Sequence, residues 1–171
     1  QVPNIHLMID YQLLCRYDLL VLLMGYAYVI HQEIVAIIDR SGSMFGKEED
    51  TIGGLNASLE VLKNDKEENT TIDVSIKLFD HEEIMLIRSK NIDNIIPLTR
   101  KDFVPRGQTA LLDAIGNTLN WVMENKIMNP NFYNSCLIYI VTDGLENSSK
   151  NYDANTIKNM IDRKSTRLNS S

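Results

Sequence analysis

The sequence is poor in residues that several classes of protein require. Two cysteines, Cys15 and Cys136, are too few among 171 residues for the disulfide framework of a small secreted domain. No Gly-x-Ser-x-Gly, His-Glu-x-x-His or P-loop signature occurs. Basic side chains are fewer than acidic ones, with a net charge of −6, and no basic stripe is interleaved with aromatic residues. Nucleic acid is therefore not an expected partner, because nothing would offset phosphate repulsion.

Long hydrophobic runs are also missing. The most apolar stretch, residues 19–30, ends at His31 after twelve residues, whereas a membrane-spanning helix needs about 20. We therefore do not expect a membrane protein. Residues 1–32 leave three interpretations open: a secretion signal or anchor, an additional packed helix, or an artefact of the start site. Asp10 and Asp18 precede the apolar stretch and disfavour a signal peptide.

What remains is the composition of one ordinary globular domain. The hydrophobic content of 44% is sufficient for a real core. We place the domain at residues 33–161, with Cys136 as a small core residue at the start of a buried strand. Residues 162–171 are basic, rich in serine and without an apolar face, and are predicted to be a non-native tail.

The most informative stretch is residues 34–46, in which an apolar run stops at an aspartate. Residues 34–38 are apolar on both alternating faces and predict a central parallel strand. Asp39 then stands at the carboxyl end, where open α/β sheets bind ligands. Asp39, Ser41 and Ser43 could aim three hard oxygens at one point, which suits Mg²⁺, Mn²⁺ or Ca²⁺. The alternative is a polar turn that caps a helix.

Two later stretches support the metal interpretation. Residues 136–142 predict a second buried strand, and it is also followed by an acid, Asp143. Thr109 follows a loop that contains Gly107 and precedes a helical pattern, so its hydroxyl could be a ligand or a helix N-cap. Two neighbouring parallel strands would bring Asp39 and Asp143 to one edge of the sheet.

The remaining pattern predicts an α/β domain. Apolar residues recur at helical spacing in 48–65, from Thr109 onward, and in about 153–161. Residues 70–80 and 84–88 predict an antiparallel hairpin, with His81, Glu82 and Glu83 in its turn. We interpret those three as a solvated turn, because the helical spacing of zinc-binding histidines is missing. Gly53 and Gly54 lower helix propensity, which suggests close packing against the sheet.

The motifs Asp39-Arg-Ser-Gly-Ser-Met, Gly107-Gln-Thr and Thr142-Asp-Gly together resemble the von Willebrand factor type A domain with its metal-ion-dependent adhesion site. The residues of these motifs are most similar to those of the bacterial and phage intracellular members of the family. The resemblance implies a Rossmann-like, doubly wound, mostly parallel sheet with one antiparallel edge strand, flanked by helices. It also implies further strands and helices beyond residue 161, without which the strand before Asp143 would be an unpaired edge. The family's five metal-site positions correspond to Asp39, Ser41, Ser43, Thr109 and Asp143.

That resemblance leads to a functional expectation. Mg²⁺, with Mn²⁺ as the alternative ion, would be bound with an open position that accepts an Asp or Glu side chain of a partner protein. The domain would be a cytoplasmic, metal-dependent protein-binding module and not an enzyme. Loop position suggests a partner-binding rim of four residues: Met44, Arg106, Gln108 and Glu146. A metal-dependent, phosphatase-like hydrolase is the rival function, and a metal that only stabilises the fold is the third.

Overall fold

The computed structural model describes residues 8–12, 29–128 and 135–168. Its strands are β1 (Met8–Gln12), β2 (Ile30–Asp39), β3 (Thr70–Phe79), β4 (Glu83–Asn91) and β5 (Ser135–Val141). Its α-helices are α2 (Glu48–Asp65), α3 (Leu111–Met128) and α4 (Ala154–Leu168), and two short 3₁₀ turns are η1 (Gly42–Met44) and η2 (Ile92–Asn94).

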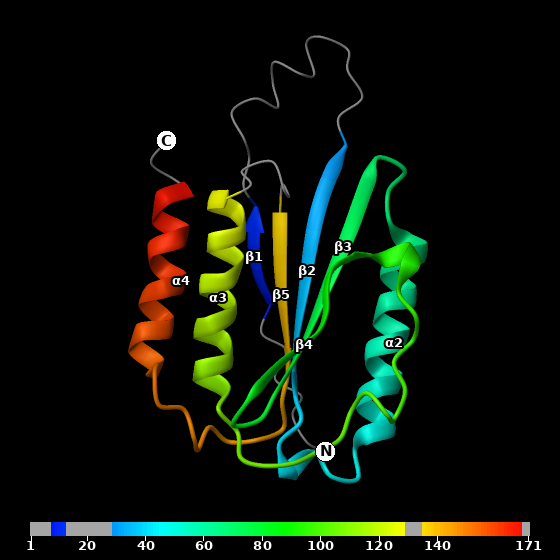
Figure 1. Cartoon of the computed structure of the whole chain (residues 1–171). Helices are drawn as coiled ribbons and strands as arrows, with labels where there is room; N and C mark the ends of the chain where they lie inside the picture. Colours follow the sequence, from blue (N-terminus) through cyan, green and yellow to red (C-terminus); the bar gives the residue numbers. More distant parts are fainter. Residues whose placement is uncertain (1–7, 13–28, 129–134, 169–171) are drawn as a thin grey trace.

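One five-stranded sheet, in the order β1-β5-β2-β3-β4, forms the centre of the molecule (Figure 1). The three inner strands, β5, β2 and β3, are parallel, and β4 runs antiparallel to β3. The predicted α/β class, with a mostly parallel sheet and an antiparallel edge strand, is confirmed.

The opposite edge differs from the prediction. β1 pairs antiparallel with β5, from Met8 opposite Tyr139 to Gln12 opposite Ser135. The expectation that β5 would be an unpaired edge is therefore wrong: a strand from far earlier in the chain occupies that edge. Most of the apolar stretch in residues 1–32, residues 19–28, lies outside the described residues, so its three interpretations stay predictions. Across the described parts of the chain, no helix is both long and apolar enough to cross a membrane.

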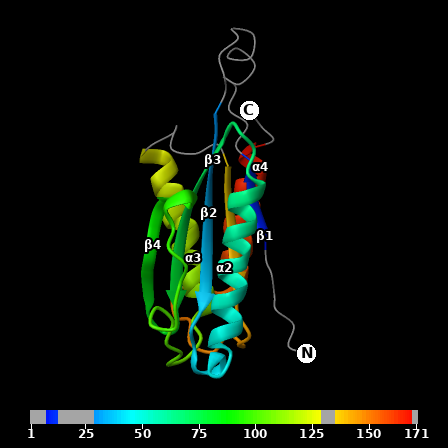
Figure 2. The same ribbon diagram turned by 90° about the vertical axis from the view of Figure 1, so that its right-hand side faces the viewer.

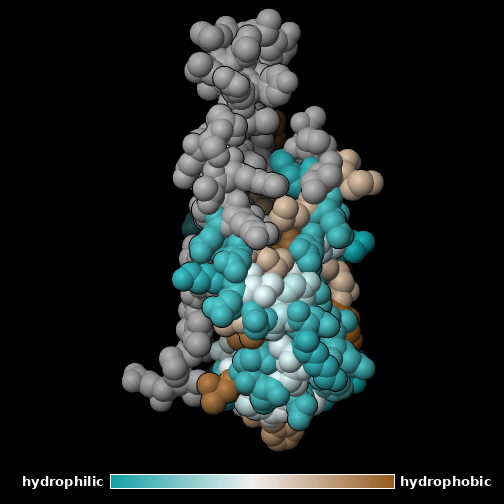
Figure 3. Space-filling view, turned by 90° about the vertical axis from the view of Figure 1, so that its left-hand side faces the viewer, coloured by the Kyte–Doolittle hydropathy of each residue, from teal (hydrophilic) through white to brown (hydrophobic). Residues whose placement is uncertain are grey.

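Helices cover both faces of the sheet, with α2 on one side and α3 and α4 on the other (Figures 1 and 2). The alternation of β2 explains this arrangement. Ile34, Ala36 and Ile38 pack in the core under α2, whereas Val35 and Ile37 pack in the core under α3 and α4. An uninterrupted apolar run is what a strand buried on both faces requires. The outer surface over the α3 and α4 layer is mainly hydrophilic (Figure 3).

Most of the predicted elements are present. The hairpin is β3–β4, the helix at 48–65 is α2, and Cys136 is buried in β5. Gly53 and Gly54 are an exception, because both are exposed and a Cβ at either would meet no atom within 4 Å. The predicted close packing of these glycines is wrong. The last helix begins at Ala154 as expected and continues to Leu168, through most of the segment 162–171, whose origin stays a prediction.

Candidate metal centre

The candidate site lies where β2 and β5 end side by side. Asp39, the last residue of β2, is completely buried. One of its carboxylate oxygens, Oδ1, accepts the Ser41 N–H at 2.7 Å, and the other, Oδ2, accepts the Thr142 hydroxyl at 2.6 Å. Because each carboxylate oxygen has two lone pairs, both oxygens keep acceptor capacity after these bonds. Asp39 is therefore held rigidly and is still able to bind a cation.

Hydroxyl groups connect the loop after β2 to the loop after β5. The Ser41 and Ser43 Oγ atoms lie 2.9 Å apart, and the Ser43 hydroxyl donates to Asp143 Oδ1 at 2.9 Å. The other Asp143 oxygen, Oδ2, forms an ion pair with the Lys47 ammonium. Four of the five predicted ligands therefore lie at the end of β2 or in the loops after β2 and β5, where their side chains share hydrogen bonds with one another or with Thr142.

Gly144 shows that the fifth ligand converges on the same point. A Cβ at Gly144 would lie 2.8 Å from Thr109 Oγ1, 3.2 Å from Ser43 Oγ and 3.3 Å from Asp39 Oδ2. Distances this short leave no room for a side chain, so a glycine is required where these oxygens gather. The structure thus brings all five predicted residues together at the carboxyl edge of the sheet.

The competing role of Thr109 as a helix cap is taken by other residues. At the start of α3, the Leu112 N–H donates to Glu146 Oε2 at 2.9 Å, and the Asp113 N–H donates to Ser149 Oγ at 3.0 Å. Burial raises the pKa of Glu146, but hydrogen bonds from Leu112, Ser148 and Ser149 outweigh it, and the pKa lies below its ordinary value. A charged Glu146 suits the positive end of the helix dipole. The loop after Asp143 caps α3, and the Thr109 hydroxyl faces Gly144 instead.

The donor set fits a hard divalent cation. Two carboxylates and three hydroxyls are the oxygen ligands that Mg²⁺ and Mn²⁺ prefer, and the set contains no thiolate or imidazole. The Lys47 ammonium on Asp143 is a positive charge already drawn to this cluster. The donors are thus of the type that a hard cation requires, and the Lys47 ammonium already pairs with one of them.

No family model matches this chain, and no curated protein is significantly similar to it. Among solved structures, the von Willebrand factor domain of the type V pili tip protein Mfa5 from Porphyromonas gingivalis is 22% identical, with a TM-score of 0.37; the match covers 54% of this chain and 32% of that one. A three-domain Mfa5 structure is 17% identical, with a TM-score of 0.40 and coverages of 72% and 25%. Proximal thread matrix protein 1 from the mussel byssus is 16% identical, with a TM-score of 0.35 and coverages of 52% and 24%.

This chain therefore spans about a quarter to a third of the length of those proteins. Identities and TM-scores this low carry no inference about what the chain binds. The five residues at the sheet edge have to be judged by their own geometry.

The four residues predicted for the partner-binding rim agree with the structure less well than the metal-site residues do. Met44 is only 3% exposed and packs in the core under α2, so its assignment to the rim is wrong. Glu146 caps α3, and Arg106 donates to Asp80 at 2.9 Å and pairs with Glu82. Both side chains are therefore engaged within the molecule. Gln108 is exposed beside Thr109, as expected of a rim residue.

Three residues near the site were missed by the sequence analysis. Phe45 is 79% exposed and Leu145 is 87% exposed, and each lies two positions after a predicted ligand. Because apolar residues are usually buried, the sequence alone does not predict that these two side chains lie on the surface. Lys47 is the third, and the sequence could have identified it, because a lysine directly before a helix is an unfavourable N-cap.

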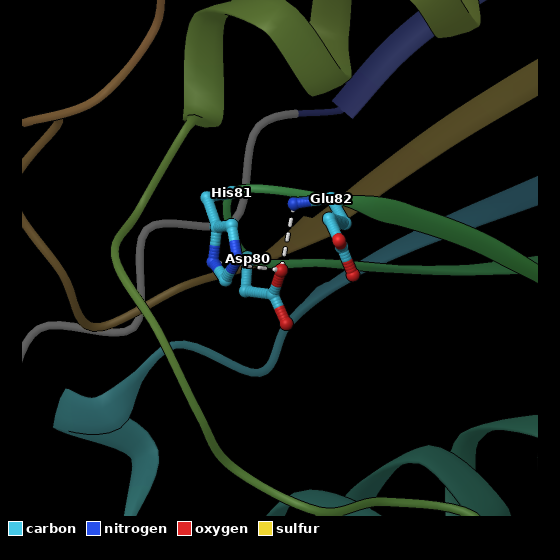
Figure 4. Close-up of side chains that lie close together, drawn as sticks. All are labelled: Asp80, His81 and Glu82. Atoms are coloured by element: carbon cyan, nitrogen blue, oxygen red, sulfur yellow. Dashed lines mark hydrogen bonds and ion pairs between the residues drawn. The ribbon is translucent and has the colours of Figure 1, made fainter.

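Asp80, His81 and Glu82 form a second acidic cluster in the turn between β3 and β4 (Figure 4). Asp80 Oδ1 accepts the Glu82 N–H at 2.7 Å, and Asp80 Oδ2 pairs with Arg40 at 3.0 Å and with Arg106 at 2.9 Å. Two guanidinium groups already balance the charge of this turn. The turn also contacts the segment around Thr109, because the Ala110 backbone N–H donates to the Asp80 carbonyl at 3.0 Å.

Proposed function

We propose that this domain is a metal-dependent protein-binding module. The observation that carries the proposal is the convergence of Thr109, Ser43 and Asp39 oxygens around Gly144, next to Asp143. Side chains from three separate loops meet there at the one edge of the sheet where α/β folds bind ligands. The resemblance of the three motifs to the von Willebrand factor type A metal site points to the same chemistry.

Each residue has a role in that proposal. Ser41, Ser43 and Thr109 supply neutral oxygens, so the protein contributes only the two negative charges of Asp39 and Asp143. A divalent ion held by these groups would keep an electrophilic position open to a carboxylate oxygen from outside. Mg²⁺ is the expected ion, with Mn²⁺ as the alternative. Thr142 and the Ser41 N–H keep the Asp39 carboxylate in place for binding.

The surface around the site supports a protein as the partner. Phe45 and Leu145 expose large apolar side chains beside the ligand loops, and Gln108 adds a polar one. Aromatic side chains such as that of Phe45 are enriched in protein interfaces, and exposed apolar side chains beside a site mark a surface that a partner can cover. We therefore propose a partner segment that presents an Asp or Glu to the ion and apolar side chains to Phe45 and Leu145.

The metal is tested by calorimetric titration of Mg²⁺ and Mn²⁺ into the chain and into Asp143→Ala. We expect saturable binding of about one ion per chain, lost in the variant, while far-ultraviolet circular dichroism of the two proteins stays the same. A folded chain that binds neither ion would overturn the proposal.

The open position is tested on the Mn²⁺-loaded chain by the relaxation of water protons. Acetate, the simplest carboxylate, should displace a bound water and lower the relaxation enhancement, whereas its neutral analogue acetamide should not. Equal effects of the two compounds would contradict carboxylate capture. Metal-dependent hydrolysis of p-nitrophenyl phosphate, lost in Asp143→Ala, would instead establish the rival hydrolase function.

A further inference from the structure

Lys47 places a positive charge directly on one of the candidate ligands. Its ammonium pairs with Asp143 Oδ2, while Ser43 donates to the other oxygen, Oδ1. The Asp143 side chain is 4% exposed, whereas the Lys47 side chain is 37% exposed. The buried carboxylate is therefore neutralised by a cation that approaches from the solvent side.

The local structure does not explain a lysine at this position. Lys47 is the N-cap residue of α2 and makes no side-chain cap hydrogen bond. Ser, Thr, Asp and Asn are preferred there, and a cation is disfavoured by the positive end of the helix dipole. Capping of the helix therefore does not account for Lys47, whereas its side chain does form an ion pair with Asp143.

The backbone directs Lys47 toward the site. Gly46 has a φ of +83°, a left-handed conformation that favours glycine, and it turns the chain between η1 and α2. The Lys47 N–H then donates to the Met44 carbonyl at 3.1 Å. This tight turn anchors Lys47 in the same loop that carries Ser41 and Ser43.

We propose that Lys47 is a tethered cation that competes with the divalent ion for Asp143, an inference that rests on the proposed function. The two carboxylates and the ammonium together carry a charge of −1. A divalent ion that binds both carboxylates competes with the ammonium for Asp143, because two cations at one carboxylate repel each other. Metal binding thus releases Lys47 to the surface, where its charge is available to an incoming carboxylate of the partner.

The competition is tested by titrating Mg²⁺ and Mn²⁺ into the full chain, into Lys47→Met and into Lys63→Met. Lys63 lies at the other end of α2, so its substitution removes the same charge far from the site. We expect Lys47→Met to bind the ions about tenfold more tightly than the unmodified chain, which corresponds to about 1.4 kcal/mol. Lys63→Met should bind them as the unmodified chain does.

The outcomes separate this inference from the function on which it rests. Equal affinities in all three proteins would overturn the competition and leave the metal site intact. Weaker binding in Lys47→Met would also overturn it, because Lys47 would then support the site. If none of the folded proteins bound either ion, the metal-dependent function itself would fall, and the competition with it. Circular dichroism of each variant confirms that the fold is retained.

Discussion

The buried carboxylate of Glu33 should make the stability of the domain depend on pH. Glu33 in β2 is 1% exposed; its Oε1 accepts the Ser75 hydroxyl at 2.6 Å, and its Oε2 is a buried oxygen without a hydrogen-bond partner. Burial raises the pKa of Glu33, the nearby Asp73 charge raises it further, and hydrogen bonds from Ser75 and Ser89 and the His31 charge offset part of this.

The sign of the effect follows from the raised pKa. The protonated form is favoured in the folded state, so the contribution of Glu33 is fully present below its unfolded pKa and is lost as the pH rises through the folded pKa. Glu33→Gln should therefore raise the free energy of unfolding at about pH 7, on the order of 1 kcal/mol, and leave it unchanged near pH 4. Urea denaturation at both pH values measures this. Glu124→Gln, an exposed charge on α3, is the control, and an equal response of the two variants would contradict the prediction.

At the scale of residues, the sequence predicted the positions of the five candidate ligands better than the surroundings of the site. Asp39 and Asp143 are placed by the strands before them, and those strands are recognisable from a few adjacent apolar residues. The surroundings depend on long-range contacts instead. Met44 is turned into the core by η1, and Glu146 reaches across to the start of α3. Neither contact is encoded in the local pattern: Met44 was wrongly expected on the rim, and the rim role of Glu146 stays a prediction.

Within the element α2, two exposed glycines weaken a helix that packs well elsewhere. Ile52, Leu55 and Leu59 are buried against the sheet, whereas Gly53 and Gly54 lie on the solvent side with open space around them. Glycine in a helix interior costs about 1 kcal/mol relative to alanine, mainly through backbone entropy. The Ser58 hydroxyl donates to the Gly54 carbonyl at 2.8 Å, but this bond to the backbone does not require a glycine and would be kept by alanine.

Gly53→Ala and Gly54→Ala should therefore each stabilise the domain by about 0.5–1 kcal/mol, and the double variant by roughly the sum. Thermal unfolding followed by circular dichroism measures both. Gly144→Ala provides the contrast, since its Cβ would collide with the site oxygens and should destabilise the chain. A loss of stability in Gly53→Ala or Gly54→Ala would show that the glycines do pack against a surface.

Helices and strands were predicted correctly where the hydrophobic periodicity continues over many residues. The alternation of β3 and the helical spacing of α2 and α3 extend over many residues, which is why their existence was recognisable. β1 has five residues and pairs with β5, more than a hundred positions away. A short edge strand has no distinctive period, and its partner is set by the whole sheet. For these two reasons β1 was not predicted from the sequence.

For the whole molecule, β1 determines whether the sheet ends in a covered or an open edge. An uncovered β5 would present a row of unpaired backbone groups, which is a template for pairing with another chain. Removal of residues 1–12 should therefore produce concentration-dependent self-association, measured by light scattering after size exclusion. The net charge of −6 opposes contact between copies. Association should consequently increase with salt, because screening weakens that repulsion. A truncated chain that stays monomeric at high salt, with the unfolding midpoint of the full chain, would show that β1 does not protect the sheet edge.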